Sequence, residues 1–298
     1  MKYAHILMAV AAEYWAIDEA KFDQIVAFLA LQASGDKYSA EEVQARINRQ
    51  AERDVARREG SVAVLPFRGV LGNRMSMMGD ISGGTSYESF GRTFDSALND
   101  NDVKAIILDT ESPGGVVNGV DELSQKIFAA RGRKPIIAHV NAYAASAAYW
   151  TVTAADEVVL NPSAEVGSIG VMQVHDDVSA ALEKAGIKRT LLSVGKYKGE
   201  GAPFQPLSDD AREHRMRIAQ HYYDSFVGRV ASNRGVSVKT VTDSFGQGRM
   251  VTAADAVSRG MADRIATLDE TIARFAGPAP VKSSRAFARE RERRALDF

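Results

Sequence analysis

Two short segments of this 298-residue sequence carry groups suited to acyl-transfer chemistry. The first, Ser112-Pro113-Gly114-Gly115, follows an apolar run that ends at Asp109. Its two glycines let the backbone turn sharply and bring N–H groups close to a ligand. With a helix beginning a few residues later, those N–H groups can stabilise an anion such as a tetrahedral oxyanion. A plain strand–helix turn accounts for the same four residues without any chemistry.

The second segment is a serine, Ser146, with two alanines on each side. It follows another apolar run and stands at the predicted N-terminus of a helix, where the backbone favours negative charge. The small neighbours leave room for a substrate backbone. A helix-capping serine among small packing residues is the structural alternative.

A serine nucleophile needs an adjacent base. The downstream candidates are His175, which two aspartates follow, and the lysines Lys196 and Lys198 in a glycine-rich stretch. A lysine can act as a base near neutral pH only where burial lowers its pKa from about 10.4 to roughly 7–8. Because a lysine in a glycine-rich turn is ordinarily solvated, spacing alone leaves the choice of base open.

The composition excludes several classes of protein. A formal net charge of −1 argues against binding nucleic acid through bulk phosphate attraction. The absence of cysteine excludes disulfides, thiolate catalysis and cysteine-ligated metals. The histidines form no metal-ligand grouping, so we expect neither a metal nor a cofactor. The longest apolar stretches are shorter than the roughly 20 residues of a membrane-spanning helix. We therefore expect no membrane contact and a cytoplasmic location.

Apolar runs and periodicity divide the chain into three regions. Residues 1–58 have a helical pattern and form an N-terminal helical extension, with a second helix over 39–58. Residues 59–276 alternate strands and helices, and residues 277–298 form a flexible charged tail. Strands are predicted over 61–66, 103–109, 135–140, 157–160, 168–172 and 189–193, and helices over 120–130, 146–155, 208–233 and 236–244. This alternation predicts an α/β fold with parallel sheets and flanking helices.

The order of several motifs resembles the signal peptide peptidase A (SppA) family of Ser/Lys peptidases. The phage branch of that family, the head (capsid) maturation proteases of lambda-like phages, is the more similar. The matching segments span about residues 60 to 275 and are 61–66 with Gly69, 107–109 leading into 112–115, 144–146, 166–172, 181–186, Tyr197-Lys198 with Pro203, and 253–263.

The resemblance implies a ClpP/crotonase-like fold and a role for each matching residue. Ser146 is the nucleophile and Lys198, which follows Tyr197, is the general base in preference to Lys196. The N–H groups of Gly115 and Ala147 form the oxyanion hole. Gly114 supports the turn, and Ser168 hydrogen-bonds the lysine to keep it neutral. One departure is Ala147-Ala148, where many cellular members have two glycines, because a methyl group at 147 narrows the site.

The function that follows is a serine endopeptidase that cuts capsid, portal or scaffold proteins during phage head assembly, in the host cytoplasm or within proheads. The family implies a homo-oligomer whose active site lies near a subunit interface. Four alternatives stay open: a cellular SppA-like peptidase, a ClpP-like Ser-His-Asp peptidase using His175, a crotonase-type acyl-CoA enzyme, and a non-enzymatic scaffold module that has lost activity. The crotonase-type enzyme lacks a persuasive pair of acidic groups near Gly115 or Ala147, where Glu111 is the nearest acid, and the presence of both Ser146 and Lys198 argues against the scaffold module.

Overall fold

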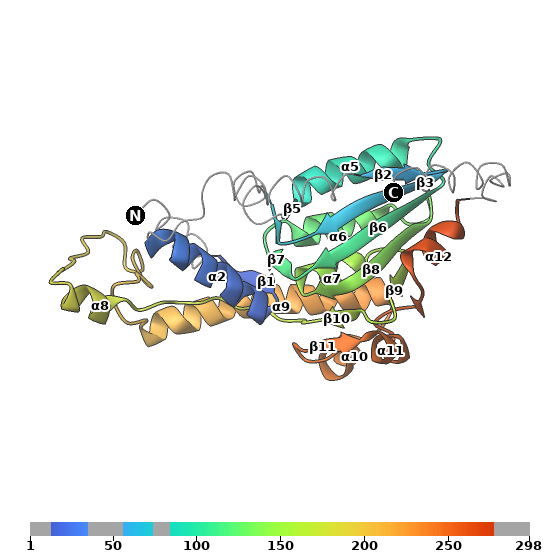
Figure 1. The fold of residues 1–298 in the computed structure, drawn as a ribbon. Coiled ribbons are helices and arrows are strands. Elements are labelled where there is room, and N and C mark those ends of the chain that lie inside the picture. Colours follow the sequence, from blue (N-terminus) through green and yellow to red (C-terminus); the bar gives the residue numbers. More distant parts are fainter. Residues whose placement is uncertain (1–12, 35–55, 74–83, 277–298) are drawn as a thin grey trace, which may run out of the picture.

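The computed structural model describes residues 13–34, 56–73 and 84–276. Its centre is a mixed sheet with a parallel core (Figure 1). The strands of this sheet are β2 (Arg57–Glu59), β3 (Val62–Arg68), β6 (Ala105–Ser112), β8 (Ile136–Ala145), β9 (Glu157–Leu160), β10 (Glu165–Gly167), β11 (Met250–Thr252) and β12 (Arg264–Ile265). They run in the order β11-β10-β8-β6-β3-β2, while β9 pairs with both β8 and β12.

Parallel pairing joins β3, β6, β8, β9 and β10, and the edge strands β2 and β11 are antiparallel to their neighbours. A smaller sheet lies at the carboxyl end of β6. Its strands are β1 (Trp15–Ile17), β4 (Leu71–Gly72), β5 (Thr85–Ser86) and β7 (Gly114–Val116), in the order β1-β7-β4-β5. The N-terminal segment therefore pairs with the glycine-rich segment that follows β6.

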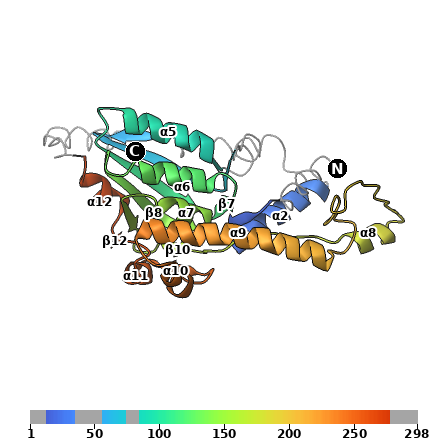
Figure 2. The same cartoon turned by 180° about the vertical axis from the view of Figure 1, so that it is seen from behind.

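Helices flank the main sheet. They are α2 (Glu19–Ser34), α5 (Tyr87–Asn99), α6 (Val120–Ala129), α7 (Ala147–Val152), α8 (Ser179–Lys184), α9 (Asp209–Arg234), α10 (Val238–Ser244), α11 (Ala253–Ser258) and α12 (Leu268–Ala273). Figure 2 shows α5, α6, α7 and α9 over one face of the sheet. The prediction of an α/β fold with parallel strands and flanking helices is confirmed.

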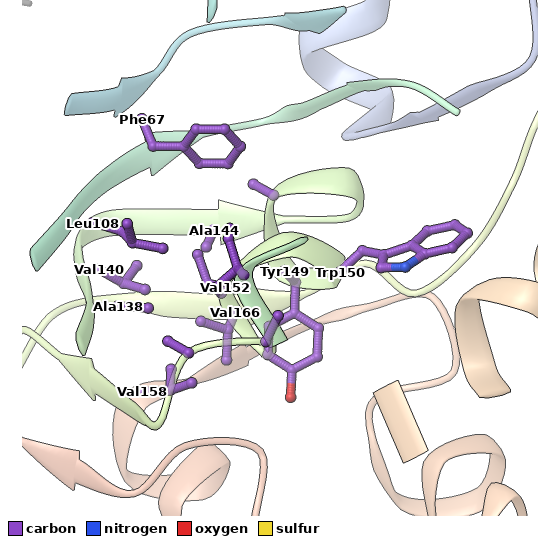
Figure 3. Packing of buried hydrophobic residues seen from close by; sticks show 14 of the residues in the cluster. Phe67, Leu108, Ala138, Val140, Ala144, Tyr149, Trp150, Val152, Val158 and Val166 are labelled. Atoms are coloured by element: carbon purple, nitrogen blue, oxygen red, sulfur yellow. The ribbon is translucent and has the colours of Figure 1, made fainter. Parts of the chain in front are cut away.

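Successive residues of the central strands face two different apolar clusters. Leu65 and Leu108 belong to the main core under the helices, whereas Val64 and Ile107 pack in a second cluster with Ile272 of α12. Burial on both faces explains why these strands read as uninterrupted apolar runs rather than alternating ones. Figure 3 shows Tyr149 and Trp150 of α7 beside other side chains of the main core, among them Leu108, Val140 and Val158.

Residues 173–208, here called the arm, extend away from the main sheet and carry α8 (Figure 1). Every side chain from 187 to 198 is exposed. Short contacts close the base of the arm, including the hydrogen bond from the Val178 N–H to the Pro203 carbonyl at 2.7 Å. The predicted strand over 189–193 is therefore wrong, because nothing in the described chain pairs with that segment.

Two other local predictions differ from the structure. The predicted strand over 168–172 reduces to one bridge at Met172, since the strand β10 ends at Gly167 and Ser168 adopts a φ of 53°. The predicted helix over 39–58 lies mostly outside the described residues. Its last residues instead begin β2, which turns at Gly60 and pairs with β3.

Among the helices in the described part of the chain, none combines the length and the apolar character that crossing a bilayer requires.

Candidate active site

Ser146 stands between the last residue of β8 and the first residue of α7. Its backbone has φ 55° and ψ −116°, a conformation that a residue with a Cβ rarely adopts. Such strain persists only where the surroundings impose it, and it is concentrated at functional sites. Ser146 is 1% exposed. The sequence expectation of a serine at a strand-to-helix turn is met, and the turn is sharper than an ordinary helix cap.

Two backbone carbonyls hold the serine from the side of β10. The Ser146 N–H donates to the Gly167 carbonyl at 2.7 Å, and the Ser146 hydroxyl donates to the Gly170 carbonyl at 3.4 Å. The Ser146 carbonyl accepts from the Trp150 N–H at 2.9 Å and so begins the helix. Gly170 belongs to the motif 166–172, and its carbonyl orients the Ser146 hydroxyl.

The alanines around Ser146 are all buried, which lets β7, β8 and α7 approach one another closely. Larger side chains then anchor α7. The Tyr149 hydroxyl donates to the Met261 carbonyl at 2.9 Å, and the Trp150 ring stacks on Phe226 of α9 with centroids 4.5 Å apart. Burial raises the pKa of Tyr149, so the phenol stays neutral and keeps donating.

Arg131 fixes the far end of α7. Its guanidinium donates to the carbonyls of Thr153, Ala154 and Ala155 at 2.6–2.9 Å and to that of Asn233 at 3.1 Å. The first three of these carbonyls belong to the turn that directly follows α7, and the fourth lies near the end of α9. The helix behind the serine is therefore held at both ends.

The structure brings the predicted oxyanion-hole segment against this turn. A Cβ on Gly114 would lie 2.9 Å from the Ala145 carbonyl oxygen and 3.1 Å from the Ala147 nitrogen. A Cβ on Gly115 would lie 1.9 Å from the Leu71 carbonyl oxygen. Both positions thus require glycine, Gly114 also because its φ is 96°. Gly114, Gly115, Ser146 and Ala147 form one contiguous group.

Ser112 shapes the glycine turn. Its hydroxyl donates to the Gly69 carbonyl at 2.7 Å and accepts from the Gly114 N–H at 3.1 Å. The Gly114 N–H is therefore occupied. The predicted donor to a reacting carbonyl is the N–H of the following residue, Gly115, which the Ser112 hydroxyl does not bind.

Ser168 lies one residue beyond the Gly167 carbonyl that holds Ser146, and its own N–H donates to the Arg249 carbonyl at 3.0 Å. Lys198 lies elsewhere, exposed on the arm. Its N–H closes a local turn onto the Gly195 carbonyl at 3.0 Å. Lys196 is also on the arm, with its amine 4.7 Å from the centre of the Tyr197 ring. Within one chain, the structure does not bring either lysine to Ser146.

His175 stands at the base of the arm, where its Nε2 lies 3.3 Å from the Gln205 carbonyl. The neighbouring Asp177 accepts from Ser179, and these hydrogen bonds lower the pKa of the Asp177 carboxyl. Neither residue has a hydrogen bond that joins it to Ser146 or to one another. The geometry of a Ser-His-Asp triad, in which the base contacts both other members, is not formed here.

The main sheet contains a cluster of buried polar side chains that no pattern in the sequence predicted. Asp109 contacts Arg68 and Asn141, and His139 lies on the neighbouring strand with Nε2 3.2 Å from the Ala266 carbonyl. Burial lowers the pKa of His139, and the charge of Asp109 only partly opposes this. A single histidine within an apolar run carried no signal of this environment. In the described residues no cluster of His, Asp and Glu side chains is suited to hold a metal ion.

Comparison with known protein families gives a match between residues 129–282 and Peptidase family S49. The chain is 32% identical over 245 residues to the capsid assembly protease C of Escherichia phage lambda, covering 80% of this chain and 55% of that protein. It is 30% identical over 211 residues to the head-tail preconnector protein GP5 of Enterobacteria phage P21, covering 71% and 42%. Protease 4 of Salmonella typhi is 29% identical over 224 residues, 75% of this chain and 35% of that protein.

The chain thus spans about half the length, or less, of these curated relatives. Among solved structures, a Pyrococcus horikoshii membrane protease specific for a stomatin homolog matches with a TM-score of 0.43 at 17% identity, over 71% of this chain and 76% of that one. An enoyl-CoA hydratase from Polaromonas sp. JS666 matches with a TM-score of 0.44 at 14% identity, over 74% and 73%.

Proposed function

This chain belongs to Peptidase family S49, and from that premise we propose that it is a serine endopeptidase with a Ser146–Lys198 dyad. The observation that carries the proposal is the placement of Ser146. A buried serine in a strained turn, beside the backbone N–H of Ala147 and the glycine-rich strand β7, is suited to attack a peptide carbonyl. No cofactor enters the reaction.

The reaction follows from these groups. The Lys198 amine takes the hydroxyl proton of Ser146 as the oxygen attacks the scissile carbonyl carbon. The N–H groups of Gly115 and Ala147 stabilise the resulting oxyanion. Collapse of this intermediate expels the amine of the leaving peptide, which receives the proton from the lysine, and leaves an acyl group on Ser146. In the second half of the reaction, Lys198 takes a proton from a water molecule as the water oxygen attacks the acyl carbon. The Ser146 oxygen then leaves, receives the proton from the lysine, and the carboxylic acid product is released.

We propose that the lysine is supplied by a neighbouring protomer. An amine takes this proton near pH 7 only where burial lowers its pKa to roughly 7–8. Lys198 is exposed on its own chain, and the arm around it presents Leu192 at 91% exposure and Val194 at 97%. Packing these apolar side chains against a second copy would bury the arm together with the lysine. The proposal therefore includes a homo-oligomer.

We propose that the substrates are proteins of a phage head: capsid, portal or scaffold proteins. The support is the capsid assembly protease of phage lambda and the head-tail preconnector protein of phage P21 among the relatives. Cleavage would take place in the host cytoplasm or within the prohead. Neither a nucleic acid nor a membrane takes part in the proposed reaction.

The test is cleavage of a capsid protein from the same phage genome, co-expressed with this chain and analysed by mass spectrometry. We expect Ser146→Ala to lower the cleavage rate by at least roughly 10⁴-fold, since loss of a catalytic nucleophile typically costs that much or more. Ser163→Ala, which removes an exposed serine outside the site, is the matched control and retains full activity. Unchanged cleavage by Ser146→Ala would refute the assignment.

The shared-site proposal has its own test. Ser146→Ala and Lys198→Ala are each inactive, but mixing them after dissociation and reassembly allows an intact serine on one protomer to meet an intact lysine on its neighbour. We expect the mixture to recover part of the activity. A mixture as inactive as either variant alone, with the oligomer shown to have exchanged subunits, would mean that both groups must belong to one chain.

A further inference from the structure

The strand β1 lies between two segments of the candidate active site. On one edge it pairs antiparallel with β7, with Ile17 opposite Gly114 and Trp15 opposite Val116. On the other edge, Trp15 exchanges two backbone hydrogen bonds with Met172, each 2.9 Å long. Met172 follows closely on Gly170, whose carbonyl accepts from the Ser146 hydroxyl. The strand β1 thus fills the space between β7 and Met172, beside Ser146.

The register of β1 points one carbonyl at the predicted oxyanion-hole donors. Asp18 N–H donates to the Pro113 carbonyl at 2.7 Å, and Val117 N–H donates to the Tyr14 carbonyl at 3.1 Å. Hydrogen-bonded pairs alternate in an antiparallel ladder, so the pair between these two, Ala16 with Gly115, is also hydrogen-bonded. The Gly115 N–H therefore faces the Ala16 carbonyl.

The position of that carbonyl oxygen agrees with this register. A Cβ on Gly114 would lie 2.2 Å from the Ala16 oxygen and 3.1 Å from the Ala147 nitrogen, so both atoms lie beside one point. Gly115 and Ala147 are the two residues whose N–H groups the proposed reaction uses. The Ala16 carbonyl stands where the carbonyl of a bound substrate would be polarised.

The side chains of β1 alternate between two environments. Trp15 and Ile17 pack in a small apolar cluster with Phe22 of α2, and the Trp15 and Phe22 rings meet edge to face at 5.5 Å. Ala16 points the other way and is fully buried in the main core. A helix that begins directly after β1, with Asp18 accepting from the Lys21 N–H at 3.1 Å, braces the strand.

We propose that β1 occupies the peptide-binding groove of its own chain, in the position that a substrate strand would take. It therefore blocks the site, and its sequence indicates which residues the groove binds. An incoming substrate adds a strand between β7 and Met172, the β-augmentation mode of peptide binding, and must displace β1 to do so. It carries a small residue such as alanine where Ala16 now lies, because that side chain enters a filled core. This inference rests on the proposed function for the identity of the site.

The inference is tested by peptide binding, with Ser146→Ala as the parent so that nothing is cleaved. The probe is a fluorescent peptide with the sequence of residues 13–20, and its dissociation constant is measured by anisotropy. Because β1 is part of the same chain, it competes with the added peptide at an effective concentration on the order of millimolar. A substitution that weakens the packing of β1 therefore leaves the groove open to the peptide more of the time. We expect Ile17→Ala to tighten peptide binding by about tenfold or more.

Ile272→Ala is the matched control, since Ile272 is 5% exposed, Ile17 is 4% exposed, and Ile272 packs in the cluster around α12. We expect it to leave the dissociation constant within about twofold of the parent. A second peptide, with leucine in place of the alanine at position 16, should bind at least about tenfold more weakly than the first. Equal binding to Ile17→Ala and the parent, or equal binding of the two peptides, would overturn the inference.

A second measurement needs no destabilised variant. In the parent chain, saturating peptide should speed hydrogen exchange at the amides of Trp15, which donates to Met172, and Ala16, which pairs with Gly115, while the amides of β8 stay protected. Unchanged exchange at β1 with peptide bound would equally overturn the inference. Because binding and exchange require no turnover, failure of wild-type cleavage with binding as expected would count against the proposed function alone.

Discussion

The turn around Ser146 and the arm around Lys198 differ in almost every physical respect. At the turn, backbone hydrogen bonds, stacked aromatics and close-packed alanines hold a strained serine that is almost inaccessible to water. On the arm, a continuous stretch of side chains is exposed, and the hydrogen bonds are mostly between near neighbours in the sequence. One half of the proposed dyad is preorganised by the fold of a single chain, and the other half is not.

This contrast separates two tasks within one proposed site. The chain fixes the proposed nucleophile and the proposed oxyanion-hole donors through its own core, where close packing makes geometry costly to change. The proposed base lies on a segment that a neighbouring molecule can bury. Activity would then depend on assembly, which is a useful property for a peptidase whose proposed substrates assemble around it.

A large loss of activity is expected from one methyl group added at the turn. Gly115→Ala places a Cβ 1.9 Å from the Leu71 carbonyl oxygen, so β7 must shift relative to β4 and displace the Gly115 N–H. We expect peptidase activity to fall by roughly 10²–10³-fold, the usual cost of losing an oxyanion-hole donor. The same change on the arm, Gly186→Ala, meets no atom within 4 Å and costs only the roughly 1–2 kcal/mol of its left-handed backbone. Similar activity losses in both variants would contradict the proposed difference in rigidity between the serine turn and the arm.

A large effect on stability is expected from the aromatic pair behind the serine. Phe226→Ala removes the ring that stacks on Trp150 and leaves a cavity between α7 and α9. We expect the free energy of unfolding, measured by denaturant titration, to fall by roughly 3–5 kcal/mol. Leu192→Ala on the arm should change the stability of the isolated chain by less than about 0.5 kcal/mol. A large loss for Leu192→Ala in a monomer would show that the arm folds onto the core.

The buried His139 predicts that the free energy of unfolding of the core depends on pH. Its pKa is lowered by burial, so the unfolded chain binds a proton at a higher pH than the folded chain does. The resulting stability is present above about pH 6.5 and is lost as the pH falls through the lower folded pKa. His139→Gln should therefore flatten the dependence of the unfolding free energy on pH in this window. An unchanged slope in the variant would contradict the assignment.

The smallest effect is expected at the lysine next to the proposed base. Lys196→Ala removes a cation–π contact with Tyr197 on an exposed segment and should change peptidase activity by less than about twofold. Lys198→Arg keeps the charge but cannot give up its proton, and should abolish activity. A severe loss for Lys196→Ala, with Lys198→Arg active, would reverse the roles of the two lysines.

The strands of the core could be predicted because both of their faces are buried. Residues 105–108 and 136–138 are apolar without interruption, and the structure pairs them directly as β6 and β8. The serine turn was also predictable, since small residues directly after such a strand indicate a place where a strand and a following helix pack closely. What no local pattern contained was the degree of strain at Ser146, which is held by the carbonyls of Gly167 in β10 and of Gly170 in the segment after it.

The failures arise where the partner of a segment is distant or absent. Residues 189–193 have the composition of a strand, yet in the described chain they have no neighbour to pair with. The three residues of β1 lie within a region that the sequence assigned to a helical extension, and their partners are near residues 115 and 172. Hydrophobic periodicity reports the face that a segment buries, but it does not report which part of the chain covers that face.

The position of β1 between β7 and Met172 also bears on the order of events during synthesis. Trp15 leaves the ribosome roughly 150 residues before the segment that completes its slot, a delay of several seconds or more at about 5–20 residues per second. Closing so long a loop follows the local pairings of the central strands. We therefore expect the nascent core to fold with its groove empty, and β1, although synthesised before the core, to pair only after it.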